Sequence, residues 1–128
     1  MTRFEHELWV GSPRAAIAFY ADAFGATVLH QVGEGDELVA QLAVGEARFW
    51  VSNANGRDRL DPLAGGATGR VLLHVADPDA VAARALAAGA TERAPVADEH
   101  GWRLGRIADP SGHEWEIGRP LGDWPPAR

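Results

Sequence analysis

The sequence LWVGSP, residues 8–13, returns as LHVADP at residues 73–78, and these two stretches decide the fold. The segment GAT, residues 25–27, likewise returns at residues 89–91. The first pair is separated by 65 residues and the second by 64, so two blocks repeat at nearly one spacing. A fixed period of this kind indicates a duplicated structural unit, and overlooking it would misassign the whole fold.

Each repeat has the order of an apolar strand, a capped helix and further strands. In the first repeat Ser12 is a good N-cap, a proline suits the first helical position, and Gly25 ends the helix. Asp77 and Gly89 take the same places in the second repeat. The remaining strands are expected at residues 27–32, 37–44 and 47–53, and then at 92–96, 102–108 and 113–118.

These patterns predict an α+β fold of two βαβββ modules, with mixed curved sheets and the helices outside. Residues 1–128 are expected to form a single domain. Its parts are repeats at 4–53 and 69–118, a polar Gly-rich linker at 54–68 and a Pro-rich tail at 119–128. The junction of the repeats is the expected place for a ligand.

The composition excludes several classes of function. The chain has 128 residues, a formal net charge of −6 and no cysteine, which rules out disulfides, thiolate metal sites and a cysteine nucleophile. The acidic balance argues against nucleic acid as a partner. No apolar run approaches the roughly 18 residues of a membrane span. We expect a cytoplasmic protein, because the N-terminal residues lack the apolar core of an export signal.

Alternation along the first strand of each repeat assigns candidate site residues. Residues 71, 73 and 75 are all apolar, so this face should pack on the helix and the opposite face carries Arg70 and His74. The repeat spacing puts Glu5, Glu7 and Trp9 on the same side of the first repeat. Charges on that face are costly unless they are paired, hydrated or used.

Tryptophan supplies further candidates, because the chain has five. Trp50 lies in the last strand of the first repeat, and Trp102 opens a strand of the second. Indole offers a broad stacking face and one N–H donor, which suits flat aromatic ligands and cations. For each tryptophan, Trp115 included, the alternative is that it fills the core.

Structural roles are open for the charged candidates as well. Glu5 and Glu7 are also consistent with a solvated edge strand, and Glu5 with an ion pair to Arg70. His74 is either a hydrogen-bonded core histidine or a ligand. The other histidines are expected on the helix side, for His6, or at the surface, for His30, His100 and His113.

Together these motifs resemble the vicinal oxygen chelate superfamily, which includes glyoxalase I, extradiol dioxygenases, and the fosfomycin- and bleomycin-resistance proteins. Residues 12–20 and 24–26 look like the family's first helix and its exit. Residues 73–91 look like its second helix region, and residues 108–117 like its closing hairpin. The resemblance covers about residues 4–118 and implies the glyoxalase/bleomycin-resistance-like fold.

The resemblance also locates the positions at which metal-using members of the superfamily hold their ion. They fall on Glu5, Trp50, Arg70 and Glu116, and only Glu116 keeps the residue typical of the family. Trp is no ligand and Arg stays protonated. We therefore expect no metal and no other cofactor. An unusual divalent-metal site made of Glu5, His74 and Glu116 is the weaker alternative.

The favoured function is that of a metal-free, bleomycin-resistance-like protein that binds a small cationic or aromatic molecule in a Trp-lined cavity. The alternatives are a metal-dependent lyase, isomerase or dioxygenase, with Glu116 as candidate catalytic group, and a structural or regulatory module. A homodimer is expected, because paired modules often complete their hollow by two-fold association. Neither nucleic acid nor a membrane is expected as a partner. The predicted ligand-binding residues are Glu5, Glu7, Trp9, Trp50, Arg70, His74, Trp102 and Glu116.

Overall fold

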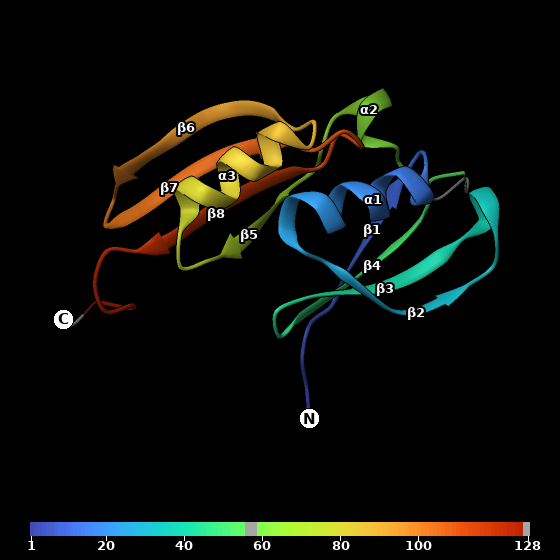
Figure 1. Ribbon diagram of the computed structural model, residues 1–128, viewed down its shortest axis with the longest axis horizontal. Helices are drawn as coiled ribbons and strands as arrows, with labels where there is room; N and C mark the ends of the chain where they lie inside the picture. The colour runs from blue at the N-terminus through green and yellow to red at the C-terminus, as the bar shows by residue number, and fades with distance from the viewer. Residues whose placement is uncertain (56–58, 127–128) are drawn as a thin grey trace.

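Two four-stranded sheets form the framework of the protein, and the computed structural model describes residues 1–55 and 59–126 (Figure 1). A short helix, α2 (Pro62–Gly65), lies between the halves. The first half contains β1 (His6–Val10), α1 (Pro13–Phe24), β2 (Thr27–Val32), the 3-10 helix η1 (Gly35–Glu37), β3 (Val39–Val44) and β4 (Ala47–Asn53). The second half contains β5 (Arg70–His74), α3 (Pro78–Ala87), β6 (Thr91–Glu99), β7 (Trp102–Ala108) and β8 (Glu114–Pro120).

The two sheets have the same topology. The strand order is β1-β4-β3-β2 in the first sheet and β5-β8-β7-β6 in the second. The first strand of each half runs parallel to the last, and the other neighbours are antiparallel. The predicted α+β fold of two βαβββ modules is therefore confirmed.

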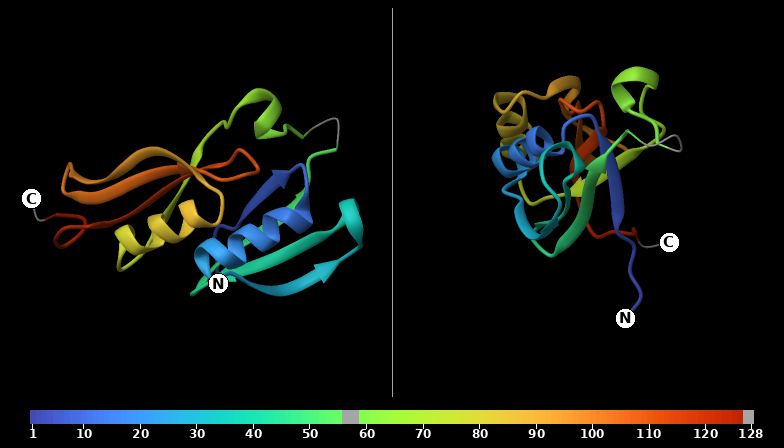
Figure 2. Two further views of the ribbon diagram at one scale, coloured as in Figure 1. Left: turned by 45° about the horizontal axis from the view of Figure 1, so that its top comes forward. Right: turned by 90° about the vertical axis from the view of Figure 1, so that its right-hand side faces the viewer.

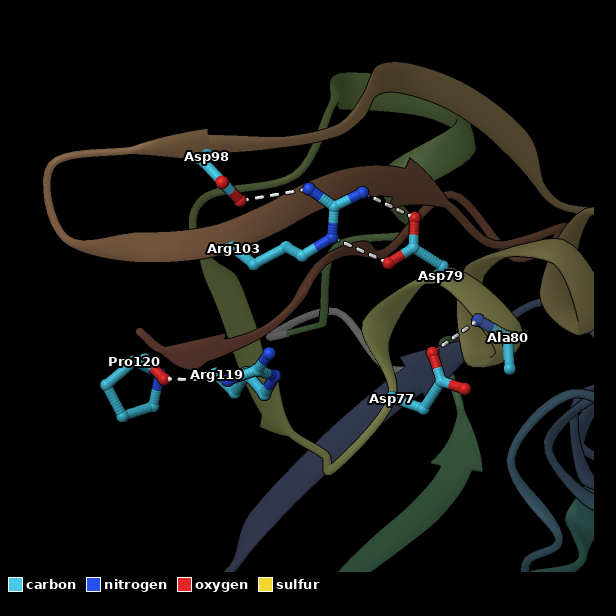
Figure 3. Close-up of polar contacts among 7 residues, drawn as sticks. All are labelled: Asp77, Asp79, Ala80, Asp98, Arg103, Arg119 and Pro120. Carbon is cyan, nitrogen blue, oxygen red and sulfur yellow. Dashed lines mark hydrogen bonds and ion pairs between the residues drawn. The ribbon is translucent and has the colours of Figure 1, made fainter. Parts of the chain in front are cut away.

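The two long helices begin alike and end differently. Ser12 Oγ accepts a hydrogen bond from the N–H of Ala15 at 3.2 Å. Asp77 Oδ1 accepts one from the N–H of Ala80 at the same distance, as Figure 3 shows. Gly25 ends α1 in the left-handed conformation, with φ at 70°. In α3 a right-handed Ala88 comes first, and Gly89 then ends the helix with φ at 117° and an N–H donated to the carbonyl of Leu86, so the predicted stop at Gly89 is confirmed.

Several strand bounds also differ from those expected. β3 starts at Val39 rather than at residue 37, because the preceding residues form η1. β6 runs on to Glu99, beyond the expected end at residue 96. β8 extends to Pro120, so the sheet takes up two residues of the predicted tail. The linker is not wholly irregular, since Asp61 Oδ1 accepts a hydrogen bond from the N–H of Leu63 and starts α2.

One apolar core runs through both halves. Helices α1 and α3 lie side by side (Figures 1 and 2), and the buried cluster continues from one half into the other. The rings of Tyr20 and Phe24 lie 5.6 and 4.9 Å from that of Trp115. Trp115 is only 3% exposed, so for this tryptophan the core-filling alternative holds.

A buried carboxylate ties α1 to the β7–β8 turn. Asp109 is 4% exposed, and its Oδ2 accepts hydrogen bonds from the hydroxyl of Tyr20 at 2.5 Å and from Trp115 Nε1 at 2.9 Å. Its Oδ1 accepts the backbone N–H groups of Ser111 and His113. Burial, and then the charge of Asp109, raise the pKa of Tyr20 well above its usual value. The two halves are thus joined by polar bonds as well as by packing.

An exposed ionic cluster holds α3 to its sheet (Figure 3). Arg103 on β7 donates through Nε and Nη2 to the two carboxylate oxygens of Asp79, at 2.6 and 2.7 Å, and through Nη1 to Asp98 at 2.9 Å. The hydrogen bonds from Arg103 lower the pKa of Asp79.

Among the described residues, no helix is long and apolar enough to cross a membrane.

Candidate functional site

Each sheet has one side turned away from the helices, and these sides carry most of the predicted site residues. Along β1, Leu8 and Val10 are buried, whereas Glu7 is exposed and Trp9 half-buried, as the alternation predicted. The first open face carries Glu5, Glu7, Trp9, Gln41, Trp50 and Ser52. The second open face carries Arg70, Leu72, His74, Trp102, Arg106 and Glu116.

Side chains of β3, β4 and the segment before β1 converge on the carboxylate of Glu5. Its Oε1 accepts hydrogen bonds from Gln41 Nε2 at 2.8 Å and from Trp50 Nε1 at 2.9 Å, and its Oε2 accepts one from Arg3 Nε at 2.6 Å. The bonds from Arg3, then from Gln41 and Trp50, lower the pKa of Glu5. Glu5 is therefore a fixed anion with both oxygens engaged.

Glu7 is held from one side only. Its Oε2 accepts hydrogen bonds from Trp9 Nε1 and from the hydroxyl of Ser52, each at 3.0 Å. In the described part of the chain, its Oε1 has no hydrogen-bond partner. The guanidinium carbon of Arg59 lies 5.9 Å from the centre of the Trp9 ring, within the range of a cation–π contact. An indole face and a carboxylate with one unpartnered oxygen therefore stand together.

The second open face instead surrounds its carboxylate with cations. Glu116 Oε2 accepts a hydrogen bond from Arg106 Nε at 3.2 Å, and Arg70 Nη1 lies 3.5 Å from the same oxygen. Arg106 also donates to Glu99 at 3.1 Å. The predicted ion pair between Glu5 and Arg70 is wrong, because each residue has its charged partner within its own half.

Aromatic rings cluster at the far end of the second open face. The rings of His74 and Trp102 are 5.7 Å apart at 60°, and those of Trp102 and Trp124 are 5.2 Å apart at 73°. His74 is exposed, so the alternative that makes it a core histidine is wrong. The tail reaches Trp102 because the N–H of Leu121 donates to the carbonyl of Gly101 at 2.8 Å.

The structure brings three of the predicted residues to one cavity. It has a volume of about 250 Å³, and Glu7 and Trp9 of β1, Arg70 of β5 and residues 60, 62 and 66–69 contribute to its wall. The other five predicted residues do not line it. They are Glu5, Trp50, His74, Trp102 and Glu116.

Sequence reasoning missed other residues of this region. His113 was expected at the surface, but it is half-buried, lines the cavity and donates from Nε2 to the carbonyl of Trp9 at 2.7 Å. His6 and Glu114 line the cavity as well. The repeat could have identified Arg106 as a residue of the second open face, since the 65-residue spacing aligns it with Gln41. The cavity itself depends on how β1 packs beside β5, which no periodicity specifies.

The residues at the family's metal positions do not fit a divalent cation. Trp50 directs an N–H donor at Glu5, and Arg70 holds a positive charge 3.5 Å from Glu116. Within the described residues, no group of three His, Asp or Glu side chains is placed to hold a metal ion. The alternative site of Glu5, His74 and Glu116 is therefore not assembled.

Comparison with known proteins finds one family and many structures of the same fold. Residues 8–118 match the family described as a glyoxalase-like domain. An uncharacterized protein of Mycobacterium bovis is 34% identical over 122 residues, covering 89% of this chain and 80% of the relative. Two uncharacterized proteins of Mycobacterium tuberculosis match at the same identity, and the matched region covers 72% of each of them.

Solved structures match over nearly the whole chain. A gene product of Arabidopsis thaliana has a TM-score of 0.74 at 24% identity, covering 93% of this chain and 99% of its own. A glyoxalase/bleomycin resistance protein/dioxygenase family enzyme from Burkholderia phytofirmans PsJN has a TM-score of 0.74 at 20% identity, covering 90% and 95%. At these identities the similarity shows the fold.

Proposed function

Since the chain belongs to the glyoxalase-like domain family of the vicinal oxygen chelate superfamily, we propose that it is a metal-free protein that binds a small planar or cationic molecule. The ligand lies where the first open face borders the cavity, against Trp9. Its positive charge is met by Glu7. The fold alone does not select this function, because one fold hosts many activities, so the proposal stands on these side chains.

The observation that carries the proposal is the pairing of carboxylate and indole on the first open face. Trp9 holds Glu7 Oε2, which leaves Oε1 able to accept a hydrogen bond from a ligand ammonium. The Trp9 ring already lies within reach of the cation of Arg59, so its face is suited to a positive group. A planar cation satisfies both features at once.

The charge distribution supports the same choice of face. The donors to Glu7 are neutral, so its negative charge is available to a ligand. On the second open face, Arg106 is bonded to Glu116 and Arg70 lies near the same oxygen, so that carboxylate is surrounded by positive charge. The same arginines support the metal-free part of the proposal, because a cation at Glu116 would face two positive groups.

Tryptophan fluorescence tests the proposal, because Trp9 and Trp50 both lie on the face concerned. The probes are 9-aminoacridine, a planar cation; phenethylamine, a ring with an ammonium group; choline, a cation without a ring; and 2-naphthoate, a planar anion. Saturable binding is expected for 9-aminoacridine and phenethylamine, and weaker binding for the other two. Absence of saturable binding by both favoured probes would contradict the proposal.

A matched pair of glutamate variants locates the site. Glu7→Gln removes the charge while it keeps an amide oxygen, and it is expected to weaken 9-aminoacridine by about tenfold. Glu34→Gln, in the exposed turn after β2, is expected to change nothing. Equal effects of the two substitutions would show that general charge attraction, and not the first open face, holds the ligand.

A second copy of the chain is proposed to cover the open faces. The first face carries the carboxylate of Glu5 and the second carries the guanidinium of Arg106, so the two faces complement each other in charge. Sedimentation equilibrium tests the homodimer: a single species of twice the chain mass is expected. A monomer at all accessible concentrations would contradict it.

A further inference from the structure

We infer that the ligand carries a carboxylate as well as its basic group, and that Arg70 binds this carboxylate in the cavity between the two halves. The inference rests on the proposed function, because Glu7 and Trp9 belong both to the first open face and to the cavity wall. It assigns the ligand to a chemical class: small aromatic molecules with an amino group and an acid group.

The first step of the argument is the bonding state of Arg70. Among the described residues its one ionic contact, with Glu116 Oε2, is 3.5 Å long, whereas charge-assisted hydrogen bonds measure about 2.7–2.9 Å. In the described part of the chain it donates no hydrogen bond, and its side chain is 44% exposed. Arg106, by contrast, donates from two nitrogens. The five donors of Arg70 are thus uncommitted, and a guanidinium of this kind suits bidentate binding of a carboxylate.

The second step is that Glu116 does not need Arg70. Arg106 Nε already donates to the same Glu116 oxygen at 3.2 Å, so an incoming carboxylate can take Arg70 without stranding a charge. Arg70 is also the first residue of β5, so its backbone is fixed by the sheet, and the residue lines the cavity. A rigid base with a free head group is suited to a binding role.

The third step is the mixed charge of the cavity. Its carboxylates are Glu7 and Glu114, its permanent cation is Arg70, and His6 and His113 add imidazoles. Glu114 is the register partner of Arg70 on the neighbouring strand β8, so an anion without a basic group would meet repulsion there. A molecule with a basic and an acidic group complements both signs, and neither a simple anion nor a simple cation does.

Size sets a further limit on the ligand. A volume of about 250 Å³ equals roughly eight waters at their share of liquid volume, and it lies below the usual range for drug-sized ligands. Its apolar wall includes Leu60, Pro62 and Val71, which suit the body of a small aromatic molecule. Phenylalanine, with a ring, an ammonium group and a carboxylate, is therefore a suitable probe.

The test compares phenylalanine with phenethylamine, which lacks only the carboxylate, and with 3-phenylpropionate, which lacks only the ammonium group. Indole fluorescence reports binding, because phenyl rings do not absorb where indole is excited. The expected result is that phenylalanine binds at least tenfold more tightly than either analogue, about 1.4 kcal/mol. Equal affinities of phenylalanine and phenethylamine would overturn the inference and leave the proposed function standing.

Two arginine variants test whether Arg70 causes the tighter binding of phenylalanine relative to phenethylamine. Arg70→Gln is expected to bring phenylalanine to the affinity of phenethylamine while the affinity for phenethylamine is unchanged. Arg93→Gln, on the exposed strand β6, is expected to keep the wild-type difference. If Arg70→Gln retains the full difference, the carboxylate is bound elsewhere and the inference is wrong. If neither phenethylamine nor 9-aminoacridine binds to the wild-type protein, the proposed function fails and the inference fails with it.

Discussion

On each open face one carboxylate is bonded by side chains of two neighbouring strands, but the strand donors differ in charge. Glu5 is bonded by the amide of Gln41 and the indole of Trp50, and Glu116 by Arg106, with Arg70 near it. The repeat spacing carries Gln41 onto Arg106 and Glu5 onto Arg70. The carboxylate has moved from the first repeat's N-terminal segment to the last strand of the second. Arginines take the places of its neutral strand donors, although Glu5 also has a cationic donor in Arg3. A duplicated scaffold has thus kept the bonding pattern while the two faces acquired different charge.

The polar bond between the halves has no symmetric copy either. Removing its carboxylate is the substitution with the largest expected effect on stability. The spacing of 65 residues carries Tyr20 onto Ala85 and Asp109 onto Val44, so the second half has no counterpart of the buried Tyr–Asp bond. Asp109→Ala removes the acceptor of four hydrogen bonds and strands two buried side-chain donors. The expected loss is about 3–5 kcal/mol in the free energy of unfolding, measured by urea denaturation.

Asp36→Ala is the matched control for Asp109→Ala. Asp36 is exposed in η1, and its carboxylate has no bond among the described residues, so its removal is expected to leave stability nearly unchanged. If the two substitutions lower the free energy of unfolding equally, the buried carboxylate of Asp109 does not stabilise the contact between the halves.

Tyr20→Phe removes only the donor of this bond and is expected to cost about 2 kcal/mol near neutral pH. Because the pKa of folded Tyr20 is raised above 10.0, its neutral hydroxyl contributes stability that is fully present below pH 10. That contribution is lost as the pH rises from 10 through the folded pKa. The wild-type protein should therefore lose stability more steeply than Tyr20→Phe above pH 10 in urea titrations. If the stabilities of the two proteins fell in parallel above pH 10, the loss would not come from ionisation of Tyr20.

Much of this architecture could be predicted from the sequence, and the reason is the repeat. Once residues 8–13 were aligned with 73–78, the topology followed, and so did the faces of β1 and β5. The bond between Tyr20 and Asp109 could not be found in this way, because it joins residues 89 positions apart and has no symmetric copy. Asp109 also has a local role in its turn, and this role explains its sequence context without any long-range partner.

For the site as well, local periodicity could be predicted from the sequence and long-range geometry could not. Alternation put Glu7, Trp9 and Arg70 on open faces correctly, since it depends only on the period of a strand. It gave no information on the distance between the two sheets, so it missed the cavity and the role of His113 within it. The ligand-binding role of the predicted residues stays a prediction.

Substitutions of the donors compare the two carboxylates directly. Arg106→Met leaves Glu116 with the 3.5 Å contact to Arg70 and leaves Glu99 without its cation, and it is expected to cost about 1 kcal/mol by urea denaturation. Gln41→Leu leaves Glu5 bonded to Arg3 and Trp50, so its cost should be smaller. A larger loss for Gln41→Leu would reverse the assignment, because the neutral donor would then matter more than the cation.

The smallest expected effect concerns the acid limb of stability and the charge of the first face. Hydrogen bonds from Arg3, Gln41 and Trp50 lower the pKa of Glu5 below 4.5 in the folded protein, so its contribution is present above pH 4.5 and is lost as the pH falls through the folded pKa. Glu5→Gln should have a shallower acid limb than the wild type, and Glu34→Gln should not. Because Arg3 is half-exposed, added salt should narrow the difference. A difference that is insensitive to salt would place the stabilisation in the neutral donors Gln41 and Trp50, the feature that distinguishes this face from its counterpart.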